Sequence, residues 1–476
     1  MSEFNIQTLA QLDKSRFSNY KSNLDFYEGR QWPAKSKNRQ LVFNYARIAI
    51  DKVTSYLMNG LNFACDSLLI SKSNFSGGPF ENDESVKDMS QKAESVIYSV
   101  YEDNNLQQLD YETEVDCAIL GDACYKVTWD VDNKKIRITS PDMNGIFAWW
   151  VGDDISKVWR VASRYTLSQD DVDILYKKTV SKKQVYMTEV WTARDFVLYL
   201  DNEIIEKKPN PYGFIPFIIF PNIRKPKSFW GISDVPPLKE AQMELNRALS
   251  QLSRILEVSG NPIAVLEGVE SSEDIAVRPG AVWNIPPDTR AYLLDLLQGG
   301  GIRLHIDYID MVYRCLHDIS EAPRAAYGGV EKELSGVALE VELQSLLQKV
   351  LRKRAIRTSV YTERNRMILS LHSKFNSEDL TPVSHRIIWG QVLPADKARE
   401  AHNEQLLVQS GIHSRRTAMD QLGIKDPEAE FEKWIGERKT ILEMNQQYRA
   451  RSARNGERER SIPAEAEGAI EKDYLS

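Results

Sequence analysis

The sequence predicts an α+β protein, and three features of the chain predict it. Segments with helical periodicity alternate with segments of period two over the first 232 residues. Two long segments without helix breakers, 238–258 and 302–319, flank a short insert that is rich in strand-forming residues. A third run without Gly or Pro, 337–375, has about 39 residues and would be about 58 Å long as a straight helix.

Composition is that of a folded protein and excludes a strongly basic one. The chain has 476 residues, 42% of them hydrophobic and 27% charged. Its net charge of −7 argues against a protein that holds DNA through its overall charge. The four cysteines form no Cys-x-x-Cys pair, which indicates buried free thiols in a reducing compartment. No signal peptide and no run of eighteen apolar residues is present, so we expect no membrane association.

The N-terminal part is predicted to contain helices followed by a small antiparallel sheet. Apolar side chains recur at three- and four-residue steps in four segments: 4–29, 44–60, 85–103 and 105–120. Asn44 is the expected N-cap of the second segment. Residues 135–200 alternate β-branched or aromatic residues with polar ones, as strands with one buried face do.

The segment 209–268 predicts a strand, a loop, a long helix and a second strand. Pro236 and Pro237 suit the first turn of the helix, and Ser233 or Asp234 is its expected cap. The helix runs to Val258 before Gly and Pro end it. Its leucines form one face, while three polar residues lie on other faces: Asn246, Gln251 and Arg254. After the insert, a helix of similar length returns to about Ser320.

A loop and the long run follow the returning helix. Residues 321–336 contain Pro323, Gly328 and Gly329 and are predicted to be a loop. We expect the long run to be kinked or to act as a scaffold, since few globular helices are so long. A strand is predicted at 385–394. A C-terminal helical group and a charged tail then complete the chain, with helices expected at 396–408, 414–422 and 427–448 and caps at Asp396, Ser414 and Asp426.

The residues offer little support for catalysis. Motifs for nucleotide phosphates, zinc proteases and serine esterases do not occur in the sequence. Asp307 and Asp310 have the spacing of a two-metal nuclease site, but a solvated helical face has the same spacing and is the preferred interpretation.

The long run also carries a basic cluster, which we expect on its surface. The cluster is consistent with binding to phosphates and equally with ion pairs to a neighbouring subunit. Its members are Lys349, Arg352, Lys353, Arg354 and Arg357.

Several segments together resemble the portal proteins of tailed double-stranded DNA phages, which connect head and tail. The resemblance covers about residues 20–440 and depends on the order of the segments more than on any single motif. They read FYEGRQW from Phe26, NYARIAIDKVTSYLMNG from Asn44, NPYGFIPFIIFPNIRKPKSFWGISDV from Asn210, ELNRALSQLSRILEVSGNPIAVLEG, SGVALEVELQSLLQKVLRKR from Ser335, IIWGQVLPAD and SRRTAMDQLGIKDPEAE.

The resemblance implies a portal fold with named parts. They are an α/β wing (1–232), a two-helix stem (233–260 and 301–319), a small β-rich clip (261–300), a tunnel loop (320–336), a long kinked wing helix with its connector (337–384), a helical crown (385–446) and a charged, partly disordered tail (447–476).

The resemblance also implies a function. A ring of about twelve copies at one capsid vertex of the virion, assembled in the bacterial host cytoplasm, would serve as the conduit for genome packaging and ejection. Its expected partners are double-stranded DNA, the large terminase subunit, the head-tail adaptor, and the major capsid and scaffolding proteins; no cofactor and no enzymatic activity are expected. A phage nuclease, a head-maturation enzyme and another self-assembling head protein are the rival interpretations.

Site residues follow from the same resemblance. Three residues of the tunnel loop are candidates for DNA contact: Arg324, Tyr327 and Lys332. Asn246, Gln251 and Arg254 are candidates for the channel side of the stem. Docking residues are expected in the clip, at Arg278, Trp283, Asp288 and Arg290. A mostly acidic bore with few cations suits sliding DNA, because each neutralised phosphate adds affinity.

Overall fold

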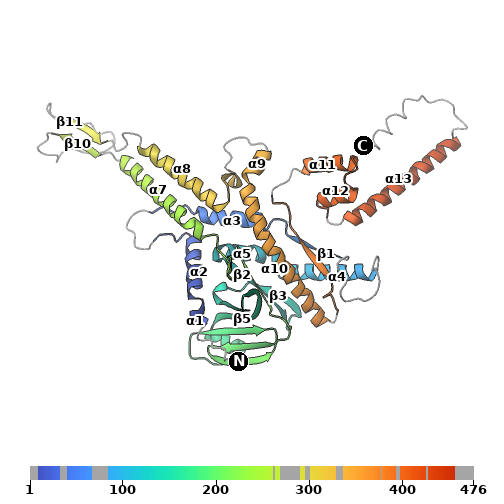
Figure 1. Cartoon of the computed structure of the whole chain (residues 1–476), viewed down its shortest axis with the longest axis horizontal. Helices are drawn as coiled ribbons and strands as arrows, with labels where there is room; N and C mark the ends of the chain where they lie inside the picture. Colours follow the sequence, from blue (N-terminus) through green and yellow to red (C-terminus); the bar gives the residue numbers. More distant parts are fainter. Residues whose placement is uncertain are drawn as a thin grey trace. The chain divides into compact units, whose positions relative to one another are not determined.

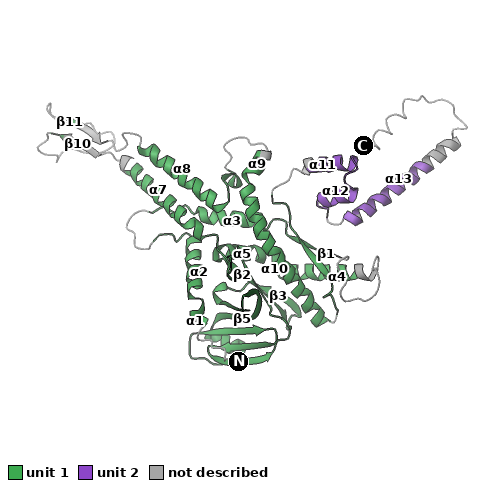
Figure 2. Ribbon diagram, viewed as in Figure 1, with its two compact units in different colours: residues 1–392 green, residues 393–476 purple. Residues whose placement is uncertain are grey.

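The structure is a computed structural model that divides into two compact units, residues 1–392 and 393–476 (Figure 2). The residues that it describes are 9–32, 40–66, 84–260, 263–267, 290–294, 301–328, 336–376, 378–392, 397–424 and 427–455. Helices and antiparallel strands both contribute to the first unit, which confirms the predicted α+β class.

A five-stranded antiparallel sheet forms one part of the first unit. Its strands follow one another in sequence order: β4 (Ile146–Val151), β5 (Asp154–Ser168), β6 (Gln184–Thr192), β7 (Asp195–Leu200) and β8 (Glu203–Pro209). Alternate side chains such as Val161, Met187 and Leu198 enter one core, as period-two patterning requires. The short helix α6 (Gln169–Tyr176) interrupts the meander and has a capping box between Ser168 and Asp171.

A second sheet has three strands in the order β3-β2-β9. The central strand β2 (Asp122–Asp130) pairs with β3 (Lys135–Thr139) on one side and with β9 (Phe217–Pro221) on the other. The prediction that 135–200 forms a single sheet was therefore wrong for β3. Local alternation identified the strand, but only tertiary pairing assigned it to β2.

The N-terminal helices lie close to where they were predicted. They are α1 (Leu9–Leu12), α2 (Lys14–Tyr27), α3 (Tyr45–Leu57), α4 (Glu84–Asp103) and α5 (Leu106–Leu120). The segment predicted as one helix from residue 4 is divided at Asp13, and residues 4–8 lie outside the described part. Asn44 caps α3 as expected, because its side chain accepts a hydrogen bond from the Arg47 backbone N–H.

Two long helices run side by side and are joined through a pair of short strands (Figure 1). Helix α7 (Pro236–Gly260) leads to β10 (Ile263–Glu267), which pairs antiparallel with β11 (Arg290–Leu294) before α8 (Gly301–Ser320) returns. Leu245 of α7 and Leu316 of α8 share a core with α3 and α5. The two helices thus pack on each other and on the body of the unit.

The long run without breakers is divided into two helices. A single residue, Leu343, separates helix α9 (Gly336–Glu342) from α10 (Gln344–Asn376), and the 3-10 turn η4 (Arg324–Tyr327) lies between α8 and α9. Backbone hydrogen bonds from Leu343 to Leu339 and from Leu347 to Leu343 continue across the division. The expected interruption thus falls at Leu343.

The unit boundary lies after the last strand. Strand β12 (Ser384–Ile388) pairs with β1 (Asn62–Asp66), more than 300 residues earlier in the chain. Beyond it, the Gly390 N–H donates to the Gly60 carbonyl at 2.9 Å. Residues 385–392 therefore belong to the first unit, whereas the resemblance implied that the crown starts at 385; the second unit starts at 393.

The second unit is helical. It contains α11 (Lys397–Gln409), α12 (Arg415–Gln421) and α13 (Pro427–Asn455). Ser414 caps α12 as predicted, while the expected caps Asp396 and Asp426 lie outside the described residues. Of the predicted tail, 447–455 continues α13, and 456–476 lies outside the described residues.

Candidate functional site

The segment that leads into α7 is fixed against the end of α5. The Asp234 N–H donates to the Ala118 carbonyl at 2.9 Å, and the Ser233 hydroxyl donates to the Ile119 carbonyl at 2.6 Å. Gly121 ends α5 with a φ of 102°, and a Cβ there would lie 2.8 Å from the Ser233 nitrogen. Close backbone contact thus requires glycine at the point where α7 departs from the body.

Asp234 is buried between two lysines of α10. Its carboxylate lies 2.5 Å from the Lys353 Nζ and 3.3 Å from the Lys349 Nζ. Burial alone would raise the pKa of Asp234, but the two ammonium groups lower it to about 2. Burial lowers the pKa of Lys353, whose carboxylate partner is shared with Lys349. We call Asp234, Lys349, Lys353 and the Ser320 carbonyl the root cluster.

The root cluster connects both long helices to α10. The Lys349 Nζ also donates to the Ser320 carbonyl at 2.9 Å, which satisfies an orphan carbonyl at the end of α8. One lysine of α10 therefore touches Asp234, two residues before α7, and the last residue of α8. Movement of either helix relative to α10 breaks a buried charge contact.

Two further arginines of α10 make buried ion pairs with α5. The Arg357 guanidinium binds Glu114 through two hydrogen bonds of 2.6 and 2.9 Å. Arg364 binds both oxygens of Asp110 in the same way and donates to the Tyr101 hydroxyl. Burial alone would lower the pKa of each arginine, but the carboxylates raise it above its ordinary value. The bidentate geometry of both pairs fixes the orientation of α10 on α5.

Arg354 holds the end of α3 and the β1–β12 region together. It donates to the carbonyls of Tyr56, Leu57 and Asn59 and, at 2.6 Å, to that of Gly390. A cation at a helix C-terminus compensates unpaired carbonyls and the helix dipole. Burial lowers the pKa of Arg354 to about 10.

The expectation that the basic cluster of α10 lies on the surface was therefore wrong for four of its members. Lys349, Lys353, Arg354 and Arg357 are each at most 7% exposed and bind groups of their own chain. Only Arg352 is exposed, and it pairs with Glu321 at 2.6 Å. The four buried cations hold the unit together and are not available to DNA phosphates.

The carboxylates that pair with these cations were not predicted from the sequence. Asp110 and Glu114 are four residues apart on α5, and their partners Arg364 and Arg357 are seven residues apart on α10. Residues four or seven apart lie on one side of a helix, so the two acids can face the two arginines when the helices pack together. That placement on one side of each helix was the available signal.

The expected channel residues of α7 lie in different environments. Asn246 is fully buried, donating to the Gln31 side chain and accepting from the Phe43 N–H, so its expected place on a channel surface was wrong. Gln251 and Arg254 are exposed, and their channel role stays a prediction.

The described part of the predicted tunnel loop is anchored to α8. Arg324 is exposed, and its guanidinium lies 6.0 Å from the centroid of the Tyr313 ring. The Tyr327 ring packs edge-on against His317, and burial raises its pKa. Lys332 lies outside the described residues. Arg324 and Tyr327 are thus close together, whereas DNA contact by all three stays a prediction.

Of the residues expected to dock partners, Arg290 alone is described; it is exposed and lies opposite Glu267 in the β10–β11 pair. Arg278, Trp283 and Asp288 lie outside the described residues. Their docking role is untested.

The carboxylates considered for catalysis are not assembled into a metal site. Asp310 forms an ion pair of 2.5 Å with Arg314, one turn along α8. Among the described residues, no three carboxylate, His or Cys side chains are grouped as metal ligands. Nor is any described helix both long and apolar enough to span a bilayer.

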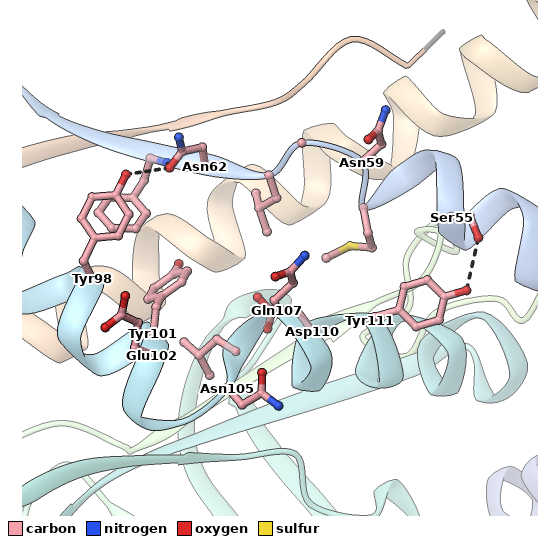
Figure 3. A pocket seen from close by; sticks show the side chains of 15 residues that line it. Ser55, Asn59, Asn62, Tyr98, Tyr101, Glu102, Asn105, Gln107, Asp110 and Tyr111 are labelled. Atoms are coloured by element: carbon pink, nitrogen blue, oxygen red, sulfur yellow. Dashed lines mark hydrogen bonds between the residues drawn. The ribbon is translucent and has the colours of Figure 1, made fainter. Parts of the chain in front are cut away.

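A cavity of about 760 Å³ opens between the end of α3, β1 and the helices α4 and α5 (Figure 3). Tyrosines and amides dominate its lining, including Tyr98, Asn62 and Tyr111. Two acidic residues, Glu102 and Asp110, line the cavity, and Asp110 is bound by Arg364, so its carboxylate is committed to an ion pair. The cavity borders the ion pairs of α5 and α10 and does not present a catalytic set.

Fold and site together define a scaffold protein: an α+β body from which two paired helices extend, fixed at their root by buried charges. A model of the family described as "Phage portal protein, SPP1 Gp6-like" matches residues 6–444. The chain therefore belongs to this family of phage portal proteins. A search of curated proteins found no match. The family is structural and non-enzymatic, takes part in DNA packaging as a component of the virion, and implies a homo-oligomeric ring and DNA as partners.

Proposed function

We propose that the chain forms a closed ring of about twelve subunits at one vertex of the phage capsid. The ring is the conduit through which the genome is packaged and later ejected. The observation that carries the proposal is the family match over residues 6–444, which includes the paired helices and their root. A conduit under load must keep its walls in place, and the buried ion pairs supply such fixation.

We assign the parts of the ring as follows. The body (1–232 with 337–392) is the wing; α7 and α8 are the stem; 261–300 is the clip; 320–336 is the tunnel loop; and the helical unit from 393 is the crown. The clip docks the large terminase subunit during packaging and the head-tail adaptor afterwards, and the wing contacts major capsid and scaffolding proteins. Assembly takes place in the cytoplasm of the bacterial host.

Native mass spectrometry of the purified full chain is the test of ring formation. We expect one closed species of about twelve subunits, with a central channel in negative-stain images. A monomer, or an open-ended series of masses, contradicts the ring. A disc without a channel contradicts the conduit.

We expect Arg324→Glu to impair genome packaging or retention several-fold while the ring still assembles. Arg324 is exposed on η4, so the change places a carboxylate where we expect DNA phosphates. Deletion of 322–329 is the harsher variant, because it removes the buried Ala322 and Ala326. Packaged DNA per particle is the measurement, and Lys207→Glu on β8 is the control, since Lys207 is also exposed. Packaging equal to that of the control shows that the loop makes no such contact.

A further inference from the structure

Helix α8 has a second apolar face that its own chain leaves exposed. Leu304 is 73% exposed and Met311 53%, and Cys315 is also exposed. These residues recur at steps of seven and four, so they share one side of the helix. Val312 and Leu316 occupy a different side, which is buried against α7 and α3. Asp307 and Arg314, both exposed, border the exposed apolar face.

Helix α7 has an exposed face with a matching pattern. Its residues recur at steps of three and four: Glu240, Met243, Arg247 and Gln251. Met243 is 43% exposed, while Leu238 and Leu245 on the other side are buried. On both helices, a methionine thus has an acidic residue about one turn before it and a basic residue about one turn after it.

The contacts within the chain fix how the two helices run past each other. The Tyr308 hydroxyl donates to Glu244 at 2.7 Å, and at the root Lys349 touches both Asp234 and the Ser320 carbonyl. The two helices are therefore antiparallel. Along their common direction, residue 234 lies beside residue 320, and residue 244 lies beside about residue 310. By the same count Met243 is level with Met311.

We propose that the exposed face of α8 packs on the exposed face of α7 in a second copy of this chain. The proposal rests on the proposed ring, whose copies are related by rotation about one axis. If that axis runs along the two helices, rotation does not shift a residue along the axis, so residues that are level within one chain are also level between neighbouring copies. Met311 then meets Met243, Asp307 meets Arg247, and Arg314 meets Glu240 of the neighbouring copy. Two apolar and four charged side chains are complementary at this one register.

The ion pairs that these residues make within the chain do not compete strongly with this contact. Arg247 pairs with Glu244 and Arg314 with Asp310, each along one turn of its own helix. The two arginine side chains are 56% and 77% exposed. Such surface pairs contribute little, and they leave hydrogen-bonding capacity for a carboxylate of the neighbour.

Charge reversal tests the register directly in the full chain. Arg247→Glu and Asp307→Arg are each expected to raise the subunit concentration at half-assembly by about tenfold, since each places like charges together. The matched double variant R247E/D307R is expected to return to within about threefold of the wild type. The control is R247E/D318R, which has the same net charge but places the new arginine at Asp318, outside the register.

Disulfide trapping gives a second readout that does not depend on assembly strength. M243C/M311C in a C65S/C315S background, which removes the two thiols that are not buried, is expected to give a covalent ladder up to the full ring number after oxidation. Q251C/M311C, displaced by about two turns, is expected to give little ladder. Buried Cys117 and Cys124 do not interfere, since burial raises the pKa of both thiols.

The outcomes separate this inference from the proposed function. If the wild type forms no closed ring, both the proposed function and the proposed interface are wrong. If the ring closes but R247E/D307R assembles no better than R247E/D318R, the interface at this register is wrong and the ring stands. Equal ladders from both cysteine pairs lead to the same conclusion.

Discussion

Replacing Asp234 by asparagine is expected to lower the free energy of unfolding of the first unit by about 3–5 kcal/mol. The substitution leaves the Lys349 and Lys353 ammonium groups buried without a counter-charge, and an unpaired buried charge is far more costly than a lost surface pair. Urea unfolding of the full chain, followed by tryptophan fluorescence, measures the change.

The matched control for Asp234 is Glu321→Gln. Glu321 also pairs with a cation of α10, Arg352, but these side chains are 37% and 53% exposed, respectively. Its loss is expected to cost at most about 1 kcal/mol. Equal effects of the two substitutions contradict the role assigned to the root cluster.

Asp234 also predicts a specific dependence on pH. Its pKa is about 2 in the folded chain, below its ordinary value of 3.8, so the folded state favours the ionised form. The resulting stabilisation, about 2.5 kcal/mol, is present above pH 4 and is lost as the pH falls from about 4 to about 2. Asp234→Asn is expected to lack this contribution. The difference in unfolding free energy between wild type and variant should therefore shrink over that range.

Replacing Arg357 by leucine is expected to cost about 3–5 kcal/mol as well, because Glu114 is then buried as an uncompensated carboxylate. Arg357 also donates to the Pro221 and Asn222 carbonyls. The substitution therefore removes the contacts of α10 with the end of β9 as well as those with α5. Urea unfolding again provides the measurement. Arg352→Leu on the exposed side of α10 is the control, with an expected change below about 1 kcal/mol.

A second substitution distinguishes loss of the charge pair from loss of packing. The double variant E114L/R357L removes both charges and is expected to recover part of the stability lost in R357L, since apolar replacements of a buried pair are often tolerated. A double variant less stable than R357L alone indicates that the network of hydrogen bonds matters more than the charge balance.

The sequence predicted the order of elements well, since local patterns determine them. Proline at the start of α7, the Asn44 cap of α3 and the Ser414 cap of α12 act on neighbouring residues and can be recognised without a fold. Helix α6 was not predicted, although the capping box of Ser168 and Asp171 was a usable local signal.

The main error of the sequence-based predictions was to expect polar residues at the surface that the fold buries. Lys353 and Arg357 were expected at the surface because charged side chains are seldom buried without partners. Their partners, Asp234 and Glu114, are more than a hundred residues away in sequence, so no local pattern connects them. Asn246 was misplaced for the same reason, since Gln31 satisfies its amide from another part of the chain.

The sequence by itself determined the α+β class, the two long helices around a strand-rich insert, the long run of α9 and α10, and the resemblance to portal proteins. Only the tertiary structure decided that β12 completes a sheet with β1, that β3 pairs with β2, and that α10 carries a buried basic ridge. Periodicity reports which side of an element is apolar, and that is a local property. Whether a charged side is exposed or paired depends on what the fold places opposite it.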